Sequence, residues 1–136
     1  MSEDLAGLYR AYLAALNERR FDDLVHFVHD ELTYNGEALT RQDYGDLIAR
    51  DVAAVPDLFY DARIVVTDGE RVACRILFDC TPQGEFLGLR SDGRRIVFAE
   101  HVFYDFRDGR IASVSSLIDR AAIAAQLEKP LASPSE

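Results

Sequence analysis

The chain has 136 residues, 49% of them hydrophobic, so it can bury one core but is too short to divide comfortably into two domains. Its formal net charge of −9 gives a surface that repels phosphate backbones, and we expect no nucleic-acid partner. We expect a single domain over residues 1–129 and a disordered tail at 130–136, where Pro and Ser collect.

The sequence predicts a soluble, cytoplasmic protein that has no membrane span and needs no cofactor. The N-terminal segment MSEDLAGLYRAYLAAL carries acids where a signal peptide needs a basic region, and its apolar positions are spaced rather than continuous. Cys74 and Cys80 lie about 20 Å apart along one predicted strand, too far to pair, as suits a reducing compartment. No residue spacing resembles a metal site, and no glycine-rich loop opens a helix.

Two helices are predicted at the start of the chain. Apolar residues recur at helical spacing over 3–18 and form one stripe. The stripe consists of Leu5, Leu8, Tyr9, Tyr12, Leu13 and Leu16. A second, short helix over 21–28 has Asp22 and Asp23 in its first turn, where the helix dipole favours acids. We expect these two helices to form an antiparallel pair.

A brief strand and a third helix should follow. The strand over 32–35 ends at Asn35-Gly36, a turn signal. Thr40 and Asp43 resemble a capping box that opens the third helix, which Pro56 stops.

The second half of the chain changes to a period of two, which indicates strands. Four long strands are expected over 58–67, 71–80, 95–106 and 110–119. Asp108-Gly109 is the strongest hairpin signal. Between the two hairpins, 81–93 is a turn-rich excursion around Phe86 that could close over a pocket, and a short helix is expected over 120–127. The predicted fold is therefore α+β, a curved antiparallel sheet wrapped as a cone around the N-terminal helices.

A two-residue loop at Asp108-Gly109 fixes a register for the last hairpin and places two carboxylates in the cone. The expected pairs are Phe106–Ile111, Tyr104–Ser113, Val102–Ser115, Glu100–Leu117 and Phe98–Asp119. Because side chains alternate, all ten share one face, with Glu100 and Asp119 as diagonal neighbours roughly 7–8 Å apart. Desolvation and mutual repulsion would raise the pKa of at least one of them toward neutrality, as a general acid or base requires.

The opposite face of this hairpin looks too apolar for water, so we expect a homodimer through the outer face of the sheet. The residues expected there are Val97, Ala99, His101, Phe103, Ala112, Val114, Ser116 and Ile118.

Structural roles compete with each catalytic one. Asp119 stands directly before the helical segment RAAIAAQL and could serve as its N-cap. Glu100 could be paired with Arg75, or a bulge could turn it outward and bring His101 into the cup. His101 otherwise points away from the cup, as an interface histidine. Tyr12 could be a core residue whose buried hydroxyl still needs a partner.

Three segments resemble a SnoaL-like polyketide cyclase, or ester cyclase, of the nuclear transport factor 2-like superfamily. They are AYLAALNERRFDDLVHFVHDELTYNG, GEFLGLRSDGRRI and FYDFRDGRIASVSSLID. The resemblance implies a cone-shaped homodimer that uses no cofactor and closes a ring by intramolecular aldol chemistry. In this family a carboxylate at the end of the last long strand acts as acid and base, a place that Asp119 occupies here.

The resemblance also directs attention to the lining of the pocket. Tyr12 falls where the related ketosteroid isomerases have an oxyanion-hole tyrosine, but Asn35 and Val102 replace their base and second acid, so steroid isomerisation is disfavoured. Ser115 stands where cyclases usually carry a large aromatic, which implies a wider pocket. We therefore expect Asp119, Glu100 and His101 as catalytic candidates. The candidates for substrate binding are Tyr12, Asn35, Val102, Tyr104, Ser115 and Phe86.

Three functions remain open at this stage. The first is acid/base cyclisation or isomerisation of a hydrophobic, polyketide-like carbonyl compound. The second is a hydrolase, epoxide hydrolase or dehydratase, because paired carboxylates can also activate water. The third is a non-catalytic protein that binds a small hydrophobic molecule.

Overall fold

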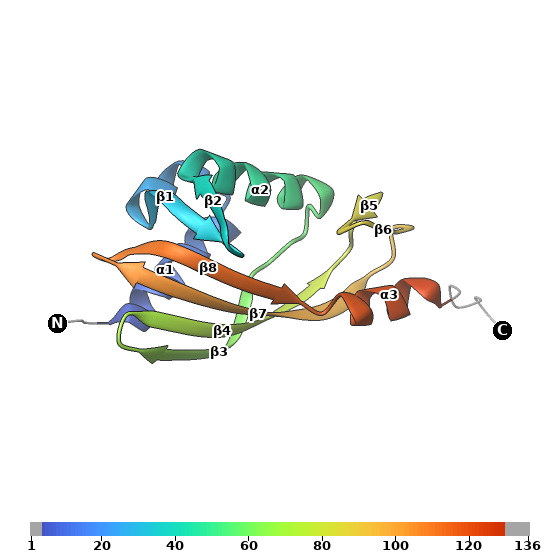
Figure 1. The fold of residues 1–136 in the computed structure, drawn as a ribbon. Helices are drawn as coiled ribbons and strands as arrows, with labels where there is room; N and C mark the ends of the chain where they lie inside the picture. Colours follow the sequence, from blue (N-terminus) through green and yellow to red (C-terminus); the bar gives the residue numbers. More distant parts are fainter. Residues whose placement is uncertain (1–3, 130–136) are drawn as a thin grey trace.

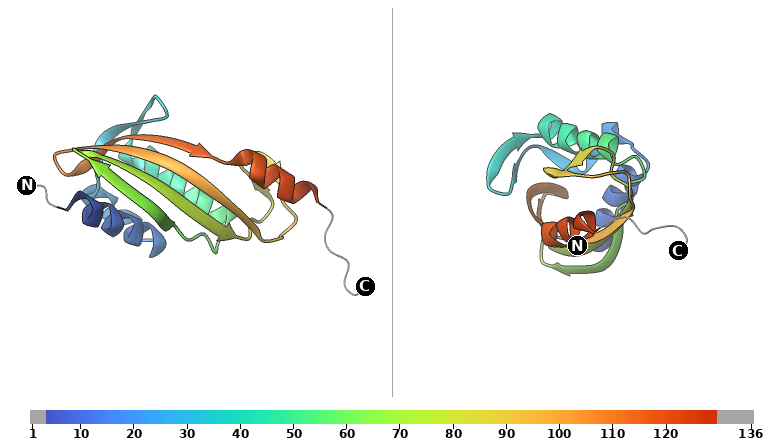
Figure 2. Two further views of the ribbon diagram at one scale, coloured as in Figure 1. Left: turned by 90° about the horizontal axis from the view of Figure 1, so that it is seen from below. Right: turned by 90° about the vertical axis from the view of Figure 1, so that its right-hand side faces the viewer.

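A strongly curved sheet wraps around the N-terminal helices in the computed structural model, which describes residues 4–129 (Figure 1). The six strands run in the order β2-β1-β8-β7-β4-β3, and all neighbours are antiparallel except β1 and β8, which are parallel. Viewed end-on, the sheet curls around the helices (Figure 2). The predicted α+β cone is confirmed. The predicted tail at 130–136 lies outside the described residues.

The helices begin where the sequence supplies caps. The first, α1 (Leu5–Asn17), starts at Asp4, whose Oδ1 accepts from the Gly7 N–H at 3.0 Å. In α2 (Arg41–Ala54), Thr40 and Asp43 form the predicted capping box. None of the helices in residues 4–129 is long and apolar enough to span a membrane.

The segment predicted as a second helix is shorter and tighter than expected. It forms a 3₁₀ helix, η1 (Phe21–His26), with no side-chain cap at Arg20 and only Leu24 buried. Val28 already belongs to the sheet: it begins β1 (Val28–Tyr34), is fully buried and pairs with Ile111. The predicted extension of this helix over residues 27–28 was therefore wrong. Burying Val28 in the sheet stabilises the fold more than continuing a helix that buries only one side chain.

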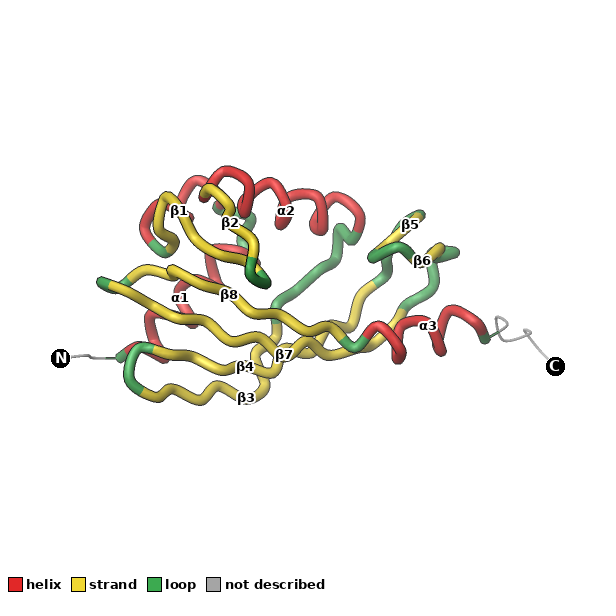
Figure 3. Tube along the Cα trace, viewed as in Figure 1, coloured by secondary structure: helices red, strands yellow, loops and turns green. Residues whose placement is uncertain are grey.

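The remaining elements follow the predicted order and are coloured by type in Figure 3. The long strands of the sheet are β3 (Asp61–Asp68), β4 (Arg71–Cys80), β7 (Ile96–Arg107) and β8 (Arg110–Ile118). The sequence did not predict β2 (Glu37–Thr40) or the small separate hairpin of β5 (Glu85–Phe86) and β6 (Leu89–Arg90). A final helix, α3 (Arg120–Glu128), follows β8. The β5–β6 hairpin, called the flap below, belongs to the predicted excursion at 81–93.

The predicted register of the last hairpin holds only at its turn. Phe106 pairs with Ile111 as expected, but Asp105 pairs with Ser113, so Ala112 is an extra residue and forms a β-bulge. Beyond the bulge each pair moves by one: Glu100 faces Ile118, and Val102 faces Ser116. The bulge lets Ile111 and Val114, which are three residues apart, both lie in the core. Every later side chain of β8 consequently points to the face opposite to the one predicted.

Candidate active site

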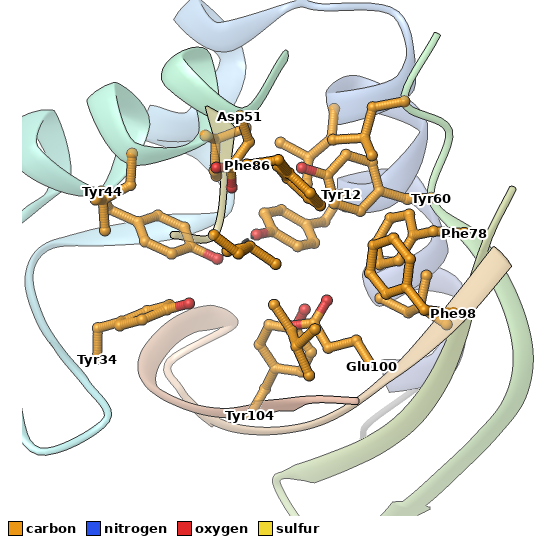
Figure 4. Close-up of a pocket in the computed structure, with 17 residues that line it drawn as sticks. Tyr12, Tyr34, Tyr44, Asp51, Tyr60, Phe78, Phe86, Phe98, Glu100 and Tyr104 are labelled. Atoms are coloured by element: carbon orange, nitrogen blue, oxygen red, sulfur yellow. Dashed lines mark hydrogen bonds between the residues drawn. The ribbon is translucent and has the colours of Figure 1, made fainter. Parts of the chain in front are cut away.

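A cavity lies between the concave face of the sheet, the helices α1 and α2, and the flap (Figure 4). The centre of a water molecule can move through about 80 Å³ of it, which leaves room for several waters or one small ligand. Most of the lining is apolar or aromatic. The lining residues are Tyr12, Leu16, Tyr34, Tyr44, Leu47, Ile48, Asp51, Leu58, Tyr60, Ile76, Phe78, Phe86, Leu87, Phe98, Glu100, Tyr104 and Ile118.

Glu100 is the acidic group on the sheet side of this cavity. It lies on β7, and its carboxylate points toward the tyrosines in Figure 4. Loss of water raises the pKa of Glu100 from its ordinary value of 4.5 to about 7, and the charge of Asp51 adds to the rise. The Ser116 hydroxyl donates a hydrogen bond to Oε2 and opposes the rise in pKa. At neutral pH this carboxyl can therefore both take up and release a proton.

Asp51 is a second carboxyl at the cavity, and α2 supplies it from the wall opposite Glu100 (Figure 4). The residue is exposed to water in the last turn of the helix. Loss of water raises the pKa of Asp51 above its ordinary value, and the nearby Arg50 lowers it in part. The two acids thus reach the same space from different elements.

Tyrosine hydroxyls pair with one another in the cavity and in the core beside it. The Tyr12 and Tyr44 oxygens are 2.5 Å apart, which joins α1 to α2, and Tyr9 donates to the Tyr104 hydroxyl at 3.3 Å. Burial raises the pKa of Tyr12 and of Tyr44 well above the ordinary value, so both stay protonated at physiological pH. In the Tyr12–Tyr44 pair one hydroxyl donates to the other, and the accepting hydroxyl keeps its own hydrogen for a ligand.

Four of the predicted site residues line the cavity: Glu100, Tyr12, Tyr104 and Phe86. Phe86 belongs to the flap, and its ring lies 5.9 Å from that of Phe98. Val102 does not line the cavity but is buried in the adjoining core. Asn35 lies outside, in the turn after β1, where its Oδ1 accepts from the Ser116 N–H at 2.8 Å and ties β1 to β8. It therefore supports the strand that carries Ser116.

Asp119, the leading catalytic candidate from the sequence, lies outside the cavity, and its predicted inward placement was wrong. The bulge at Ala112 turns it to the outer side. There its Oδ1 accepts from the Ala122 N–H at 3.0 Å and caps α3, the structural alternative considered above. The predicted neighbourhood of Glu100 and Asp119 in one cup does not form.

The other two candidates also lie outside. Ser115 is exposed on the outer face, for the same reason as Asp119. His101 lies on the outer face too, as its position on β7 predicted, and its Nε2 is 2.6 Å from the Arg75 guanidinium. Because a guanidinium can only donate, Nε2 of His101 accepts, and its proton sits on Nδ1.

The sequence did not identify several members of the site. Tyr34, Tyr44, Tyr60 and Asp51 come from segments whose place around the cavity depends on the path of the chain in three dimensions. Ser116 was assigned to the outer face by the same register error that brought Asp119 inside. One signal was present: Ile111 and Val114 are both apolar but three residues apart, a spacing that strict alternation cannot bury.

A cone of this kind, with helices on the concave side of a curved sheet and a largely apolar pocket holding an acid, defines a nuclear transport factor 2-like domain. A family model described as SnoaL-like polyketide cyclase matches residues 6–127, and the chain belongs to this family.

One of the solved structures supports that assignment, and two more distant ones share the fold. A SnoaL-like polyketide cyclase from Agrobacterium tumefaciens is 44% identical, with a TM-score of 0.90, over 93% of this chain and 99% of its own. TsrD from Streptomyces laurentii is 24% identical, with a TM-score of 0.83, over 94% and 98%. AclR from Streptomyces galilaeus, provisionally named a hydroxylase, is 24% identical, with a TM-score of 0.76, over 93% and 98%. A comparison with curated proteins found no match.

Proposed function

We propose that the protein is a cofactor-free acid/base catalyst that closes a ring in a hydrophobic, polyketide-like carbonyl compound, with Glu100 as the base. The observation that carries this proposal is the carboxyl of Glu100, whose pKa is about 7 inside an aromatic cavity. A base is most effective when its pKa lies near the working pH, because it is then both available and strong enough. Membership of the SnoaL-like family supports the reaction class.

The proposed reaction moves one proton and forms one carbon–carbon bond. The Glu100 carboxylate removes a proton from a carbon flanked by carbonyl groups, which leaves an enolate. The enolate carbon attacks a second carbonyl of the same folded substrate, and that oxygen becomes an alkoxide. The proton held by Glu100 passes to the alkoxide, so the carboxylate is restored and no atom is gained or lost.

Two features of the cavity support such a sequence. The free hydrogen of the Tyr12–Tyr44 pair can be donated to the enolate oxygen, where negative charge develops. The Ser116 hydroxyl fixes one oxygen of Glu100 and leaves Oε1 to face the substrate.

The flap has to move for a large substrate. The cavity is smaller than the roughly 300–1,000 Å³ of pockets that hold drug-sized ligands. Phe86 and Leu87 line the cavity from the small β5–β6 hairpin, which is separate from the main sheet. Displacement of this hairpin would open the site by separating the buried Phe86 from Phe98, and its return would exclude water during the reaction.

The proposal can be tested without the natural substrate. Exchange of the α-protons of 2-indanone for deuterium, followed by proton NMR, measures removal of a proton next to a carbonyl. The rate due to the protein should rise with pH, reach a plateau above about pH 7 as Glu100 ionises, and fall by about a hundredfold or more in Glu100→Gln.

Glu70→Gln is the matched control, because Glu70 is an exposed glutamate in the β3–β4 turn, away from the cavity. It should leave the exchange rate unchanged. Exchange that is equally fast in Glu100→Gln, or exchange that is lost in Asp119→Asn instead, would contradict the assignment of Glu100 as the base.

A further inference from the structure

The charges around the cavity all have one sign. Among the described residues that line it, Asp51 and Glu100 are acidic and none is Lys, Arg or His. The guanidinium of Arg19, a neighbour of the loop before β3, is occupied by the backbone carbonyls of Leu16, Pro56 and Leu58. An anionic ligand would therefore enter a space that two acids already line, and Arg50, the cation that lowers the pKa of Asp51, does not itself line the cavity.

Both acids keep hydrogen-bonding capacity for a ligand. Ser116 engages Oε2 of Glu100, whereas the described residues provide no hydrogen-bond partner for Oε1. The Asp51 carboxylate likewise has no side-chain or backbone donor within the described part of the chain. Two carboxylates that face a cavity from opposite walls, a desolvated one at Glu100 and an exposed one at Asp51, favour a positive group between them.

The rest of the lining also suits a cation. Eight of the 17 lining residues are aromatic, and five of these are tyrosines. Figure 4 shows the rings of Tyr12, Tyr44 and Tyr60 around the space between Asp51 and Glu100. The face of an aromatic ring carries partial negative charge and attracts ammonium groups, and cages of such rings recognise alkylated amines.

We propose that the cavity takes its substrate as an organic cation, with a protonated or quaternary amine held by Asp51, Glu100 and the tyrosine rings, and that it rejects free acids. The proposal rests on the proposed function in one respect, since it names the charge of the substrate on which Glu100 would act. A positive charge beside Glu100 also favours its ionised form. Arrival of the substrate would then increase the fraction of Glu100 that can act as the base.

Three small compounds of similar shape and different charge test the proposal. They are choline, its neutral isostere 3,3-dimethylbutan-1-ol, and the anion 3,3-dimethylbutanoate. Their dissociation constants would be measured by ligand-observed NMR at pH 8, where Glu100 is largely ionised. Choline should bind at least tenfold more tightly than the alcohol, and the anion should show no saturation.

Variants assign the preference to the two acids. Asp51→Asn and Glu100→Gln, both close to isosteric, should each reduce the ratio of the choline and alcohol affinities at least threefold. Asp46→Asn removes the same charge from the same helix at a residue that does not line the cavity, and it should leave the ratio unchanged. Circular dichroism would verify that each variant is folded, and the three ligands on the unmodified protein provide a test that needs no variant.

The proposal is overturned if the alcohol binds as tightly as choline, if the anion binds best, or if choline shows no binding. It is also overturned if neither acid changes the ratio. The 2-indanone assay separates this failure from that of the proposed function. If exchange depends on Glu100 but choline is not preferred, only the proposal of a cationic substrate is refuted. If choline is preferred but exchange is unchanged in Glu100→Gln, only the assignment of Glu100 as the base is refuted.

Discussion

Glu100 and Asp119 lie near the same end of the β7–β8 hairpin, yet the sheet sends them to opposite faces. On the concave face, Glu100 loses water and its pKa rises to about 7. On the outer face, Asp119 accepts from a helix N–H and remains exposed. The two residues carry the same chemical group, so the difference comes from their surroundings alone. A one-residue bulge in β8 keeps Asp119 away from the concave face that Glu100 occupies.

The largest effect on stability should come from a charge placed on the buried face of β7, compared with the same charge on its exposed face. Val102 and Phe103 are neighbours on β7, the first buried and the second 52% exposed. Val102→Asp should cost more than about 4 kcal/mol of unfolding free energy, because it buries an unpaired charge. Phe103→Asp should cost a monomer less than about 1 kcal/mol, since its side chain faces outward. Urea unfolding measures both, and equal losses would contradict the assignment of the two faces.

Phe103→Asp also bears on the partner expected from the sequence. The outer face exposes the large apolar side chains Ile64, Val66, Val97, Phe103 and Leu117. We propose that a second copy of the chain covers this face, and the substitution should then convert the dimer to a monomer in sedimentation. A dimer that withstands the new charge would place the interface elsewhere.

The next effect is the pH dependence of stability caused by Glu100. Because folding raises its pKa, the folded protein holds a proton that the unfolded chain has released between about pH 4.5 and 7. Stability therefore falls as the pH rises through this interval, by about 3 kcal/mol at about 1.4 kcal/mol per pKa unit. Urea unfolding at pH 4 and pH 8 should show this loss of unfolding free energy in the parent protein, and the loss should be absent in Glu100→Gln. The same pH dependence in both proteins would mean that Glu100 is not desolvated.

A smaller effect is expected for the cap on the outer face. Asp119→Ala should lower the unfolding free energy by about 1 kcal/mol, because the N–H of Ala122 loses its acceptor. Exchange of 2-indanone should continue at the parental rate. A variant that is as stable as the parent but inactive would return Asp119 to the catalytic role that the sequence suggested.

The smallest effect should follow from Asp51. Its charge contributes to the raised pKa of Glu100, so Asp51→Asn should move the midpoint of the pH–rate profile to lower pH. Desolvation remains the larger cause, and the midpoint should therefore stay above the ordinary value of 4.5. A midpoint that does not move would show that solvent screens the two acids from each other.

Local signals in the sequence were sufficient to predict most of the fold. The Thr40–Asp43 capping box, the turn at Asp108-Gly109 and the alternation along β4 each determine structure within a few residues. The bulge at Ala112 was missed because it resolves a competition between alternation and the burial of two side chains. Because of that single error, the sequence predicted Asp119 beside Glu100, where the structure has Ser116. Glu100 itself was placed correctly, since β7 has no bulge.

The tyrosines illustrate a different limit. Tyr34, Tyr44 and Tyr60 are distant from one another in sequence, and nothing local distinguishes a cavity tyrosine from a core one. Tyr34 and Tyr44 meet because β1 pairs in parallel with β8 while α2 covers the concave face of the sheet, and Tyr60 reaches them from the segment before β3. Long-range pairing of this kind is not encoded in periodicity.

The most direct test of the account is the titration of Glu100 itself. Protein labelled with ¹³C at the glutamate carboxyl would be titrated by NMR, with the Glu100 signal assigned by its disappearance in Glu100→Gln. The account predicts a midpoint near pH 7, far above the ordinary value of 4.5. A midpoint near the ordinary value of 4.5 would contradict it, because Glu100 would then be a solvated acid with no more claim to catalysis than Asp119.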